Sequence, residues 1–436
     1  MTHRIVDSAT RRAFLATCGL TAASCAAGRN DSDARESKSA ARDTADDDAL
    51  AALSDQRHTG EPIQPTERAQ RRKRAGTILA QQSLDAVLME GGATMSYLSG
   101  VGWGHSERMF GLVQLADGSH FWICPRFEES KACLRIDADG GPGGEIVAWD
   151  EHEYAYRPLA AALRARGVER LGIEPGLRYG FADRTAEAFG REHIASGQAF
   201  VIALRSRKDA HELALLRRAN ELTQLAIRTV ADRLEPGMRG SEIAGWMDRA
   251  HKKLGMSSPW CLALIGPAAA LPHGDPSRDV LARGDVVLID TGASFHGYQS
   301  DNTRTWVFGA APSAEVERVW HCVRDAQRRA FEATRPGVRC GDIDLVARAH
   351  IEASGFGPGY RTFTHRLGHG IGMEGHEDPY FDSGSDVVLA SGMTLSSEPG
   401  IYLPERFGVR IEDIVAVTET GADHFGTWQL GPRSPA

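Results

Sequence analysis

The sequence has few cysteines, and none of them are paired at the spacing of a metal or redox motif. Seven cysteines occur in 436 residues, and none forms a Cys-x-x-Cys. This absence argues against a zinc ribbon and against a thioredoxin-like redox site. Cys18 and Cys25 lie in the first 28 residues, which leaves five cysteines in the rest of the chain. Because five is an odd number, we expect the core rather than disulfides to hold the fold.

Basic clusters interleaved with aromatic residues are also missing, and so are long apolar runs. The net charge of -8 is spread along the chain, and no run of Lys and Arg alternates with aromatic residues. The pattern of a nucleic-acid-binding surface is therefore absent. The Ala-rich stretch that ends at Ala27 is too short and too weakly apolar to span a membrane. What is present is 42% apolar and 25% charged residues, which is typical of a soluble globular protein, and the length predicts two domains.

The first 28 residues have the features of a targeting signal. The segment Thr10-Arg11-Arg12-Ala13-Phe14-Leu15 places two arginines before the apolar run, and it resembles a twin-arginine export signal. Ala22-Ala23-Ser24-Cys25 is similar to a lipoprotein cleavage box, with Ala where Leu is usual. The sequence therefore predicts a periplasmic protein, either free or anchored by a lipid at Cys25. A cysteine in such a segment can equally serve as a small apolar residue.

Beyond the signal, the patterns predict a linker and two α/β domains. Residues 29–65 have almost no large apolar side chain and are predicted to form a disordered tether. Residues 66–205 combine helical spacing with short apolar runs, which indicates an alternating α/β domain. A charged segment at 205–209 marks the boundary with a second domain over 206–430.

The second domain is predicted to start with a long amphipathic helix. Leu213, Leu216, Ala219 and Leu222 recur at helical intervals. Further helices are expected at 240–254, 313–334 and 341–353, with a buried strand at Val286–Ile289 and Gly-rich strands after Phe363. The stretches 210–308 and 313–417 have a similar order of elements, which suggests a duplicated unit, although no residue-level repeat proves it.

Two aspartates near the buried strand are the first candidate for chemistry. Asp290 ends the aliphatic run Val286–Ile289, and Asp301 follows shortly after. If residues 294–297 form a four-residue hairpin loop, the two aspartates lie opposite each other with Cβ atoms about 4.5–5.5 Å apart. Like charges at that distance need a cation or a shared proton between them. The alternative is a surface hairpin with two solvated aspartates, which the apolar flank argues against.

Three later segments supply further ligand types. His369 is bracketed by glycines in Leu367-Gly368-His369-Gly370-Ile371, so the backbone there can approach another element closely. Glu398 follows Ser396-Ser397, and Glu412 lies on the polar face of Val409-Arg410-Ile411-Glu412. Each segment alone fits a hydrogen-bonded core histidine or an edge strand with a solvated side. Together, four carboxylates and one imidazole fit two divalent cations bridged by shared carboxylates.

These motifs also carry a family resemblance. They are Leu288-Ile289-Asp290-Thr291-Gly292, Asp301-Asn302-Thr303-Arg304-Thr305, Gly368-His369-Gly370-Ile371-Gly372, Ser397-Glu398-Pro399-Gly400 and Val409-Arg410-Ile411-Glu412-Asp413. In this order they resemble the pita-bread metallopeptidases, in the branch of Xaa-Pro dipeptidases (prolidases) and Xaa-Pro aminopeptidases. Residues 66–205 are similar to the N-terminal domain of the creatinase and prolidase group. The resemblance implies an α/β (α+β) protein with a pita-bread catalytic domain.

The resemblance also implies a set of metal ligands. Asp290 would bind one cation, Asp301 and Glu412 would bridge both, and His369 and Glu398 would complete the second. Two such cations lower the pKa of water between them and polarise the scissile carbonyl. Manganese is the metal that the resemblance favours, and cobalt, zinc and iron also accept mixed oxygen and nitrogen ligands.

Supporting residues of the family have matches here too. Glu398 would carry a proton from water to the leaving proline nitrogen. The pocket histidines, which would steady the substrate and its oxyanion by hydrogen bonds, correspond to His273, His365 and His376. Arg410 would orient the carboxylates of Glu412 and Asp301. The resemblance further implies a homodimer.

Proline preference follows from the resemblance as well. An X-Pro amide has no N–H, so it needs a pocket made for the proline ring. Many prolidases place an arginine shortly after the equivalent of His376 to hold the carboxylate of a dipeptide, but residues 377–393 contain no Arg or Lys. Tyr380, Arg361 or His365 would have to take its place. This difference leaves the choice between dipeptides and longer peptides open.

The leading interpretation is thus a dinuclear Xaa-Pro dipeptidase, and three alternatives remain. The first is an Xaa-Pro aminopeptidase that acts on longer peptides. The second is a lyase or small-amidine hydrolase, because related folds host other chemistries. The third is a peptide-binding module without activity, although such proteins usually lose ligands and none is missing here.

Overall fold

The computed structural model describes residues 50–138, 140–276 and 279–436. The predicted export signal, the lipid site at Cys25 and the tether up to residue 49 lie outside these residues. Residues 53–436 form one compact unit. Within the described part of the chain, no helix has the length and apolarity to cross a membrane. The five cysteines found there are all free thiols.

The N-terminal part of this unit is a mixed six-stranded sheet with the order β4-β3-β2-β1-β5-β6. Strands β1–β2 and β2–β3 pair antiparallel, and the other neighbours pair parallel. The elements are α2 (Pro65–Gln81), β1 (Ala86–Glu90), α3 (Ala93–Ser99), β2 (Gly111–Leu115), β3 (His120–Pro125), α4 (Glu129–Ile136), β4 (Glu145–Trp149), α5 (Tyr156–Ala165), β5 (Leu171–Ile173), α6 (Tyr179–Phe189), β6 (Ile194–Ser196) and α7 (Gln198–Arg205). Short 3-10 turns lie at Arg57–Thr59, Arg126–Glu128 and Arg191–His193.

The sheet is covered on both faces, which explains why β1 is apolar from Ala86 to Met89. Val87 and Met89 pack into one core with α2, whereas Ala86 and Leu88 pack into a second core with α5. This alternation follows from the two-residue period of a strand. A strand buried on both faces reads as a continuous apolar run, as the sequence predicted here.

The described residues of the C-terminal part form two helix pairs and three sheets. Its elements are α8 (Ala210–Ala231), α9 (Gly240–Lys253), β7 (Ser257–Ile265), β8 (Val286–Phe295), β9 (Tyr298–Gln299), β10 (Asn302–Val307), α10 (Ala314–Ala333), α11 (Cys340–Ile351), β11 (Gly368–Gly370), β12 (Glu377–Phe381), β13 (Thr394–Ser397), β14 (Gly400–Leu403), β15 (Phe407–Arg410), β16 (Asp413–Val417) and β17 (Ala422–His424). A 3-10 turn spans Gly266–Ala270, and a π-helical turn at Glu352–Phe356 follows α11. The strand orders are β10-β8-β7 with β9 on β8, β12-β11-β13-β16-β17, and β14-β15.

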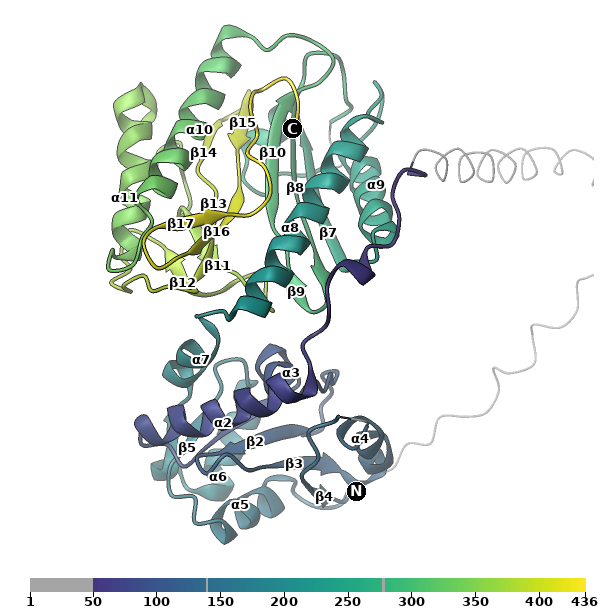
Figure 1. The fold of residues 1–436 in the computed structure, drawn as a ribbon, viewed down its shortest axis with the longest axis vertical. Coiled ribbons are helices and arrows are strands. Elements are labelled where there is room, and N and C mark those ends of the chain that lie inside the picture. The colour runs from purple at the N-terminus through teal and green to yellow at the C-terminus, as the bar shows by residue number, and fades with distance from the viewer. Residues whose placement is uncertain (1–49, 139, 277–278) are drawn as a thin grey trace, which may run out of the picture. The chain divides into compact units, whose positions relative to one another are not determined.

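Each large sheet has its own pair of helices. Helices α8 and α9 contact β8 and β7, and α10 and α11 contact β13 and β12. Figure 1 shows α10 and α11 on one side of the strands, while α8 crosses in front of β8. The first and second halves therefore repeat the order helix, helix, strands, in line with the predicted duplication. An isolated bridge between Thr303 and Glu412 joins the two large sheets.

Helix α8 begins where the charged segment predicted a boundary. Asp209 caps the helix by accepting a hydrogen bond from the Glu212 backbone N–H, and the Glu212 carboxylate accepts one in return from Asp209 N–H. This reciprocal capping box satisfies two amide groups that a helix start leaves free. The helix therefore has a local reason to start at Ala210.

The predicted tether ends earlier than residue 65. Leu53 and Ile63 are each only 5% exposed, and the Gln56 backbone N–H donates to the Leu254 carbonyl. Arg218 on α8 also donates to Thr59 Oγ1. The prediction was wrong for 53–65 because a few apolar residues within a polar composition are enough to anchor a segment on a preformed surface.

Candidate metal centre

The five predicted metal ligands lie in or next to strands of the two large sheets, and their side chains converge. Asp290 lies within β8, Asp301 precedes β10, and His369 lies on β11. Glu398 follows β13, and Glu412 precedes β16. Three groups, each with ligand atoms within 4.8 Å of one another, could hold a metal ion: Asp290, Asp301 and Glu412; His369, Glu398 and Glu412; and Asp301, His369 and His376. The sequence-predicted set is thus brought together from distant parts of the chain.

The hairpin that carries the two aspartates differs from the prediction. Phe295 pairs with Tyr298, so the turn is the two-residue His296-Gly297, with φ of 49° and 90°. This is the geometry of the tight primed turns that suit right-twisted hairpins. Asp290 therefore pairs with Thr303 and not with Asp301. The strand register is shifted by two residues relative to the prediction. Because side chains alternate between the two faces of a sheet with a period of two, Asp290 and Asp301 still lie on the same face.

His369 is held in an orientation that suits a ligand. Its backbone N–H donates to Ser396 Oγ, and Nδ1 lies 3.0 Å from the Gly370 carbonyl oxygen. Only a protonated Nδ1 can bond a carbonyl, so Nε2 carries the lone pair. Nε2 faces carboxylate oxygens of Asp301 at 3.7 Å, Glu398 at 3.4 Å and Glu412 at 3.9 Å. A lone pair and three carboxylates around one point repel each other unless a cation lies between them.

The predicted role of the glycines around His369 agrees with the geometry. A Cβ on Gly368 would lie 2.0 Å from the Ser396 carbonyl oxygen, and one on Gly370 would lie 2.4 Å from the Glu377 carbonyl oxygen. Real Cβ atoms do not approach that closely. The glycines therefore allow β11 to lie close to both of its neighbours.

Two carboxylates each have one oxygen bonded to the protein and one without a partner. Asp290 Oδ2 accepts from Arg410 at 2.7 Å, and Glu412 Oε2 accepts from Thr303 Oγ1 at 2.7 Å. Asp290 Oδ1 and Glu412 Oε1 are buried and have no hydrogen-bond partner among the described residues. Buried oxygens without partners are costly, and a bound cation removes that cost. The donor set therefore fits divalent metal ions.

Electrostatics agree with this fit. Burial, with the charges of Asp290 and Glu398, raises the pKa of Asp301 well above its ordinary value. Burial and the neighbouring carboxylates do the same to the pKa of Glu412. Burial also raises the pKa of Glu398 to about 7 and lowers that of His369 to about 3. The cluster therefore resists carrying its full negative charge without cations.

Models of two known protein families match this chain. Residues 214–419 match the model for metallopeptidase family M24, and residues 71–207 match the creatinase/prolidase N-terminal domain. The Xaa-Pro dipeptidase of Pyrococcus horikoshii is 31% identical over 79% of this chain and 93% of its own length. The chain belongs to metallopeptidase family M24.

Solved structures of M24 peptidases match the fold as well. The dipeptidase PepE from Mycobacterium ulcerans superposes with a TM-score of 0.79 at 30% identity, over 86% of this chain and 99% of that one. The prolidase from Thermococcus sibiricus gives a TM-score of 0.74 at 30% identity, over 82% and 96%. These matches confirm the predicted family and the predicted fold class, an α/β chain with a pita-bread catalytic domain behind a creatinase-like domain.

In this M24 peptidase, Arg410 supports the centre through several contacts. Besides Asp290, its guanidinium donates to Thr303 Oγ1 and to the Tyr402 hydroxyl. Thr303 in turn donates to Glu412. Arg410 thus contacts Asp290 directly and Glu412 through Thr303, whereas the sequence predicted Glu412 and Asp301 as its partners.

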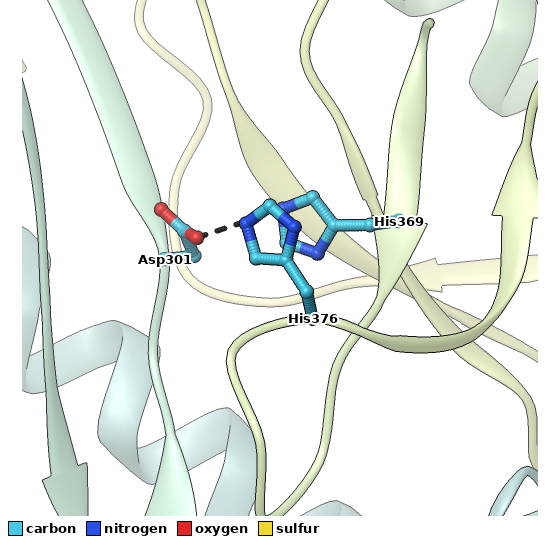
Figure 2. Close-up of side chains that lie close together, drawn as sticks. All are labelled: Asp301, His369 and His376. Atoms are coloured by element: carbon cyan, nitrogen blue, oxygen red, sulfur yellow. Dashed lines mark ion pairs between the residues drawn. The ribbon is translucent and has the colours of Figure 1, made fainter. Parts of the chain in front are cut away.

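The three pocket histidines all line one cavity of about 400 Å³ with the five candidate ligands and Arg410. His376 stacks on His369, with ring centroids 3.7 Å apart and an interplanar angle of 9°. Figure 2 shows the two rings side by side, with Asp301 opposite them. His365 Nδ1 contacts the Arg366 carbonyl, and its Nε2 lies 2.7 Å from the Tyr402 hydroxyl. Both ring nitrogens of His365 are therefore engaged within the protein.

The cavity also has lining residues that the sequence reasoning missed. Trp260 and Leu262 on β7, with Pro272, provide its apolar wall. Arg366 lines it too, and its guanidinium lies 4.2 Å from the ring centroid of Tyr380. Tyr380 pairs with His369 across β11 and β12.

Arg366 differs from the other cations near the centre. Among the described residues, no carboxylate forms an ion pair with it, and its guanidinium makes no hydrogen bond. Its charge nevertheless lowers the pKa of His376 after the larger effect of burial. Arg361, one of the substitutes suggested by the sequence, is exposed and lies outside the cavity lining. The available signal for Arg366 was its position directly before the segment Leu367–Ile371 that carries His369.

Proposed function

We propose that this chain is a dinuclear-metal Xaa-Pro dipeptidase. The observation that carries the proposal is the overlap of two ligand groups: one with Asp290 and Asp301, the other with His369 and Glu398, both including Glu412. Two divalent cations held there would polarise the scissile carbonyl and make water a stronger nucleophile at neutral pH. Asp301 also lies 3.7 Å from His369, which supports Asp301 and Glu412 as the bridging carboxylates.

We assign proton transfer to Glu398. Its pKa of about 7 and its place in the cavity suit a group that takes a proton from water and returns it to the proline nitrogen. Ser396 Oγ donates a hydrogen bond to Glu398 Oε1 at 3.1 Å and holds that oxygen in place. The other oxygen would face the substrate.

The three pocket histidines would have two different roles, hydrogen bonding to the substrate and positioning of other side chains. His273 and His376 line the cavity and would donate hydrogen bonds to the carbonyl oxygen as charge develops on it. His365 accepts from the Tyr402 hydroxyl, which itself accepts from Arg410. His365 would therefore act by positioning Tyr402 and Arg410, and it stays neutral because burial lowers its pKa to about 3.

A preference for dipeptides is supported by Arg366. It is a cation without an ion-pair partner in the described part of the chain, and it lies in a cavity that is otherwise rich in carboxylates. The free carboxylate of a dipeptide would form an ion pair with Arg366. The amino group of the same substrate would be attracted to the carboxylates of the candidate metal ligands. Tyr380 holds the guanidinium by a cation–π contact. The role that the sequence gave to Tyr380 would thus be shared with Arg366.

The test compares a dipeptide with its amide. Arg366→Ala should raise the KM for Leu-Pro by about 10- to 100-fold, because a charge-assisted hydrogen bond is lost. The KM for Leu-Pro-amide, which has no carboxylate, should change little. Arg361→Ala removes a nearby exposed arginine and serves as the matched control.

Other outcomes would favour the alternatives. Efficient release from Arg-Pro-Pro without cleavage of Leu-Pro or Gly-Pro would support the Xaa-Pro aminopeptidase. Absence of any X-Pro cleavage by protein with verified metal content would support a different hydrolase or a lyase on this fold. Metal analysis of the active protein identifies the cation, for which we propose manganese.

Location and assembly complete the proposal. We propose export to the periplasm through the twin-arginine segment, with a lipid at Cys25 as the anchored form, and a homodimer as the working state. Fractionation of cells that express the full chain, with a Cys25→Ser comparison, tests the first two. Light scattering of the metal-loaded protein tests the third.

A further inference from the structure

A buried ionic cluster lies next to the catalytic cavity. Glu377, whose side chain is 9% exposed, contacts Lys208 Nζ at 2.6 Å and the Arg205 guanidinium at 2.5 Å. The side chains of Lys208 and Arg205 are only 1% and 6% exposed. Arg205 also pairs with Glu374 at 2.7 Å. Buried charges in such a cluster depend on one another, since removing one leaves the others uncompensated.

The two cations come from the segment that joins the two matched family domains. Arg205 ends α7, and Lys208 precedes the cap of α8. The Lys208 backbone N–H donates to the Gly392 carbonyl, which fixes this segment against the turn before β13. The positions of the two charged groups are therefore set by the backbone as well as by Glu377.

Glu377 is the first residue of β12 and closes the tight turn that follows β11; residues 372–377 are here called the His376 loop. A Cβ on Gly372 would lie 2.5 Å from Glu377 Oε1, so the carboxylate packs directly against the start of the same loop. At that start, the Gln299 backbone N–H donates to the Gly372 carbonyl. The loop is thus held at both ends, and at its second end Glu377 is anchored by its strand pairing with Gly370 and by the ion pairs of its carboxylate.

His376 directly precedes this anchor and points into the catalytic cavity. Its ring stacks on His369, and it also lines a second cavity of about 250 Å³ that Arg205 and Glu377 line as well. A ring at such a junction has open space on one side. Its orientation therefore depends on the loop backbone and on the stacking contact rather than on tight packing all round.

We propose that Lys208 and Arg205 position His376 for catalysis by fixing the Glu377 carboxylate. The inference rests on the proposed function, in which His376 donates a hydrogen bond to the reacting carbonyl. Loss of an anchoring charge would let the His376 loop shift, and a displacement of about 1 Å at a catalytic group can cost about 100-fold in rate. Substrate binding and metal content would be changed far less, because none of the three residues lies in the ligand set.

The first measurement separates kcat from KM. Lys208→Met should lower kcat for Leu-Pro by about 10- to 100-fold, with KM and metal content near those of the unmodified protein. Lys208→Arg keeps the charge and should restore most of the activity. Arg207→Met removes an exposed charge from the same segment, at a residue whose guanidinium bonds the Ser391 carbonyl, and should leave kcat unchanged.

The decisive measurement is a double-mutant cycle with His376→Ala. If Lys208 acts through His376, Lys208→Met should cause no further loss of kcat in the His376→Ala background. Independent, multiplying losses would overturn the inference while leaving the proposed function intact. Full activity of His376→Ala would instead remove the role of His376 and the inference with it. Should Lys208→Met not fold, the near-isosteric Glu377→Gln enters the same cycle with the same expectations.

Discussion

At the scale of single residues, the metal centre is built from groups that are unfavourable alone. Burial and the neighbouring carboxylates raise the pKa of Asp301 and of Glu412, and two carboxylate oxygens of the cluster have no partner in the described part of the chain. Proteins retain such groups where function requires them, at a cost in stability. The cost should therefore appear when the cations are removed.

The cost in folding stability that the buried carboxylates cause can be measured at Glu398. Its folded pKa of about 7 lies above its ordinary value of 4.5, so the protonated form contributes stability that is full below about 4.5 and is lost as the pH rises through about 7. In metal-free protein, Glu398→Gln should therefore be more stable than the unmodified chain at pH 8, with little difference at pH 4.5. Thermal unfolding in chelator at both values measures this.

The control for that experiment is Glu61→Gln at an exposed position. Its effect on the midpoint should be small at either pH, since exposed substitutions change stability by about 0.5 kcal/mol or less. A Glu398→Gln protein that is destabilised equally at pH 4.5 and 8 would contradict the assignment of the raised pKa.

The sequence predicted which residues form the site better than it predicted which of them contact each other. Asp290, Asp301, His369, Glu398 and Glu412 were all expected from motifs, because a ligand type beside glycine or after an aliphatic run leaves a local signal. Arg410 was expected to orient Glu412 and Asp301, and the structure pairs it with Asp290 and links it to Glu412 only through Thr303. Arg366 was not predicted as a pocket cation, because its position near His369 in the sequence does not reveal its contact with Tyr380 on β12.

At the scale of elements, the β8–β10 hairpin determines where two of the ligands lie. Its close packing depends on Gly292, where a Cβ would lie 1.9 Å from the Ser300 carbonyl oxygen and 2.9 Å from the Trp260 indole nitrogen. The strand β7 on the other side of β8 was not predicted. It contains Pro259 at a register shift between Ser257 and Trp260, and proline in a run argues against a regular strand although an edge strand tolerates it.

Gly292→Ala should therefore disturb the centre without touching a ligand. The added methyl group would push β8 and β10 apart, so metal content and kcat should both fall by about tenfold or more, with a lower midpoint of unfolding. Metal analysis and Leu-Pro assays on the same sample measure this.

Gly245→Ala in α9 is the matched control. Its Cβ would meet only Arg249, at 3.9 Å, and alanine in a helix interior is favoured over glycine by about 0.5–1 kcal/mol. This variant should retain its metal and unfold slightly later. Normal metal content in Gly292→Ala would show that the hairpin adapts and that its spacing is not critical.

At the scale of the whole molecule, the centre lies where the two halves meet. The first half contributes Asp290 and Asp301, the second contributes His369, Glu398 and Glu412, and the Thr303–Glu412 bridge joins their sheets. The two halves, and the similar order of helices and strands in each, could be predicted from the hydrophobic periodicity of the sequence. Long amphipathic helices and aliphatic strands give the clearest periodic patterns. The hairpin register and the bridge were not, since they depend on turn geometry and on contacts between distant segments.

Cations should consequently stabilise the whole C-terminal part. A cation present at 100 times its Kd stabilises the folded state by about 2.7 kcal/mol for each independent site. Adding manganese to chelator-treated protein should raise the unfolding midpoint in a concentration-dependent way. A protein with Asp301→Asn and Glu412→Gln, which lacks both proposed bridging carboxylates, should show little of this shift.

The bridge between Thr303 and Glu412 has a consequence for how the enzyme matures. Contacts between residues so distant in the chain form late in folding, because the entropy of closing the intervening loop must be overcome first. We therefore expect that the ions do not serve as a template around which the chain condenses, as they do in small zinc-dependent domains. They should enter a scaffold that is already assembled, so supply of metal should limit how much enzyme becomes active rather than how much of it folds.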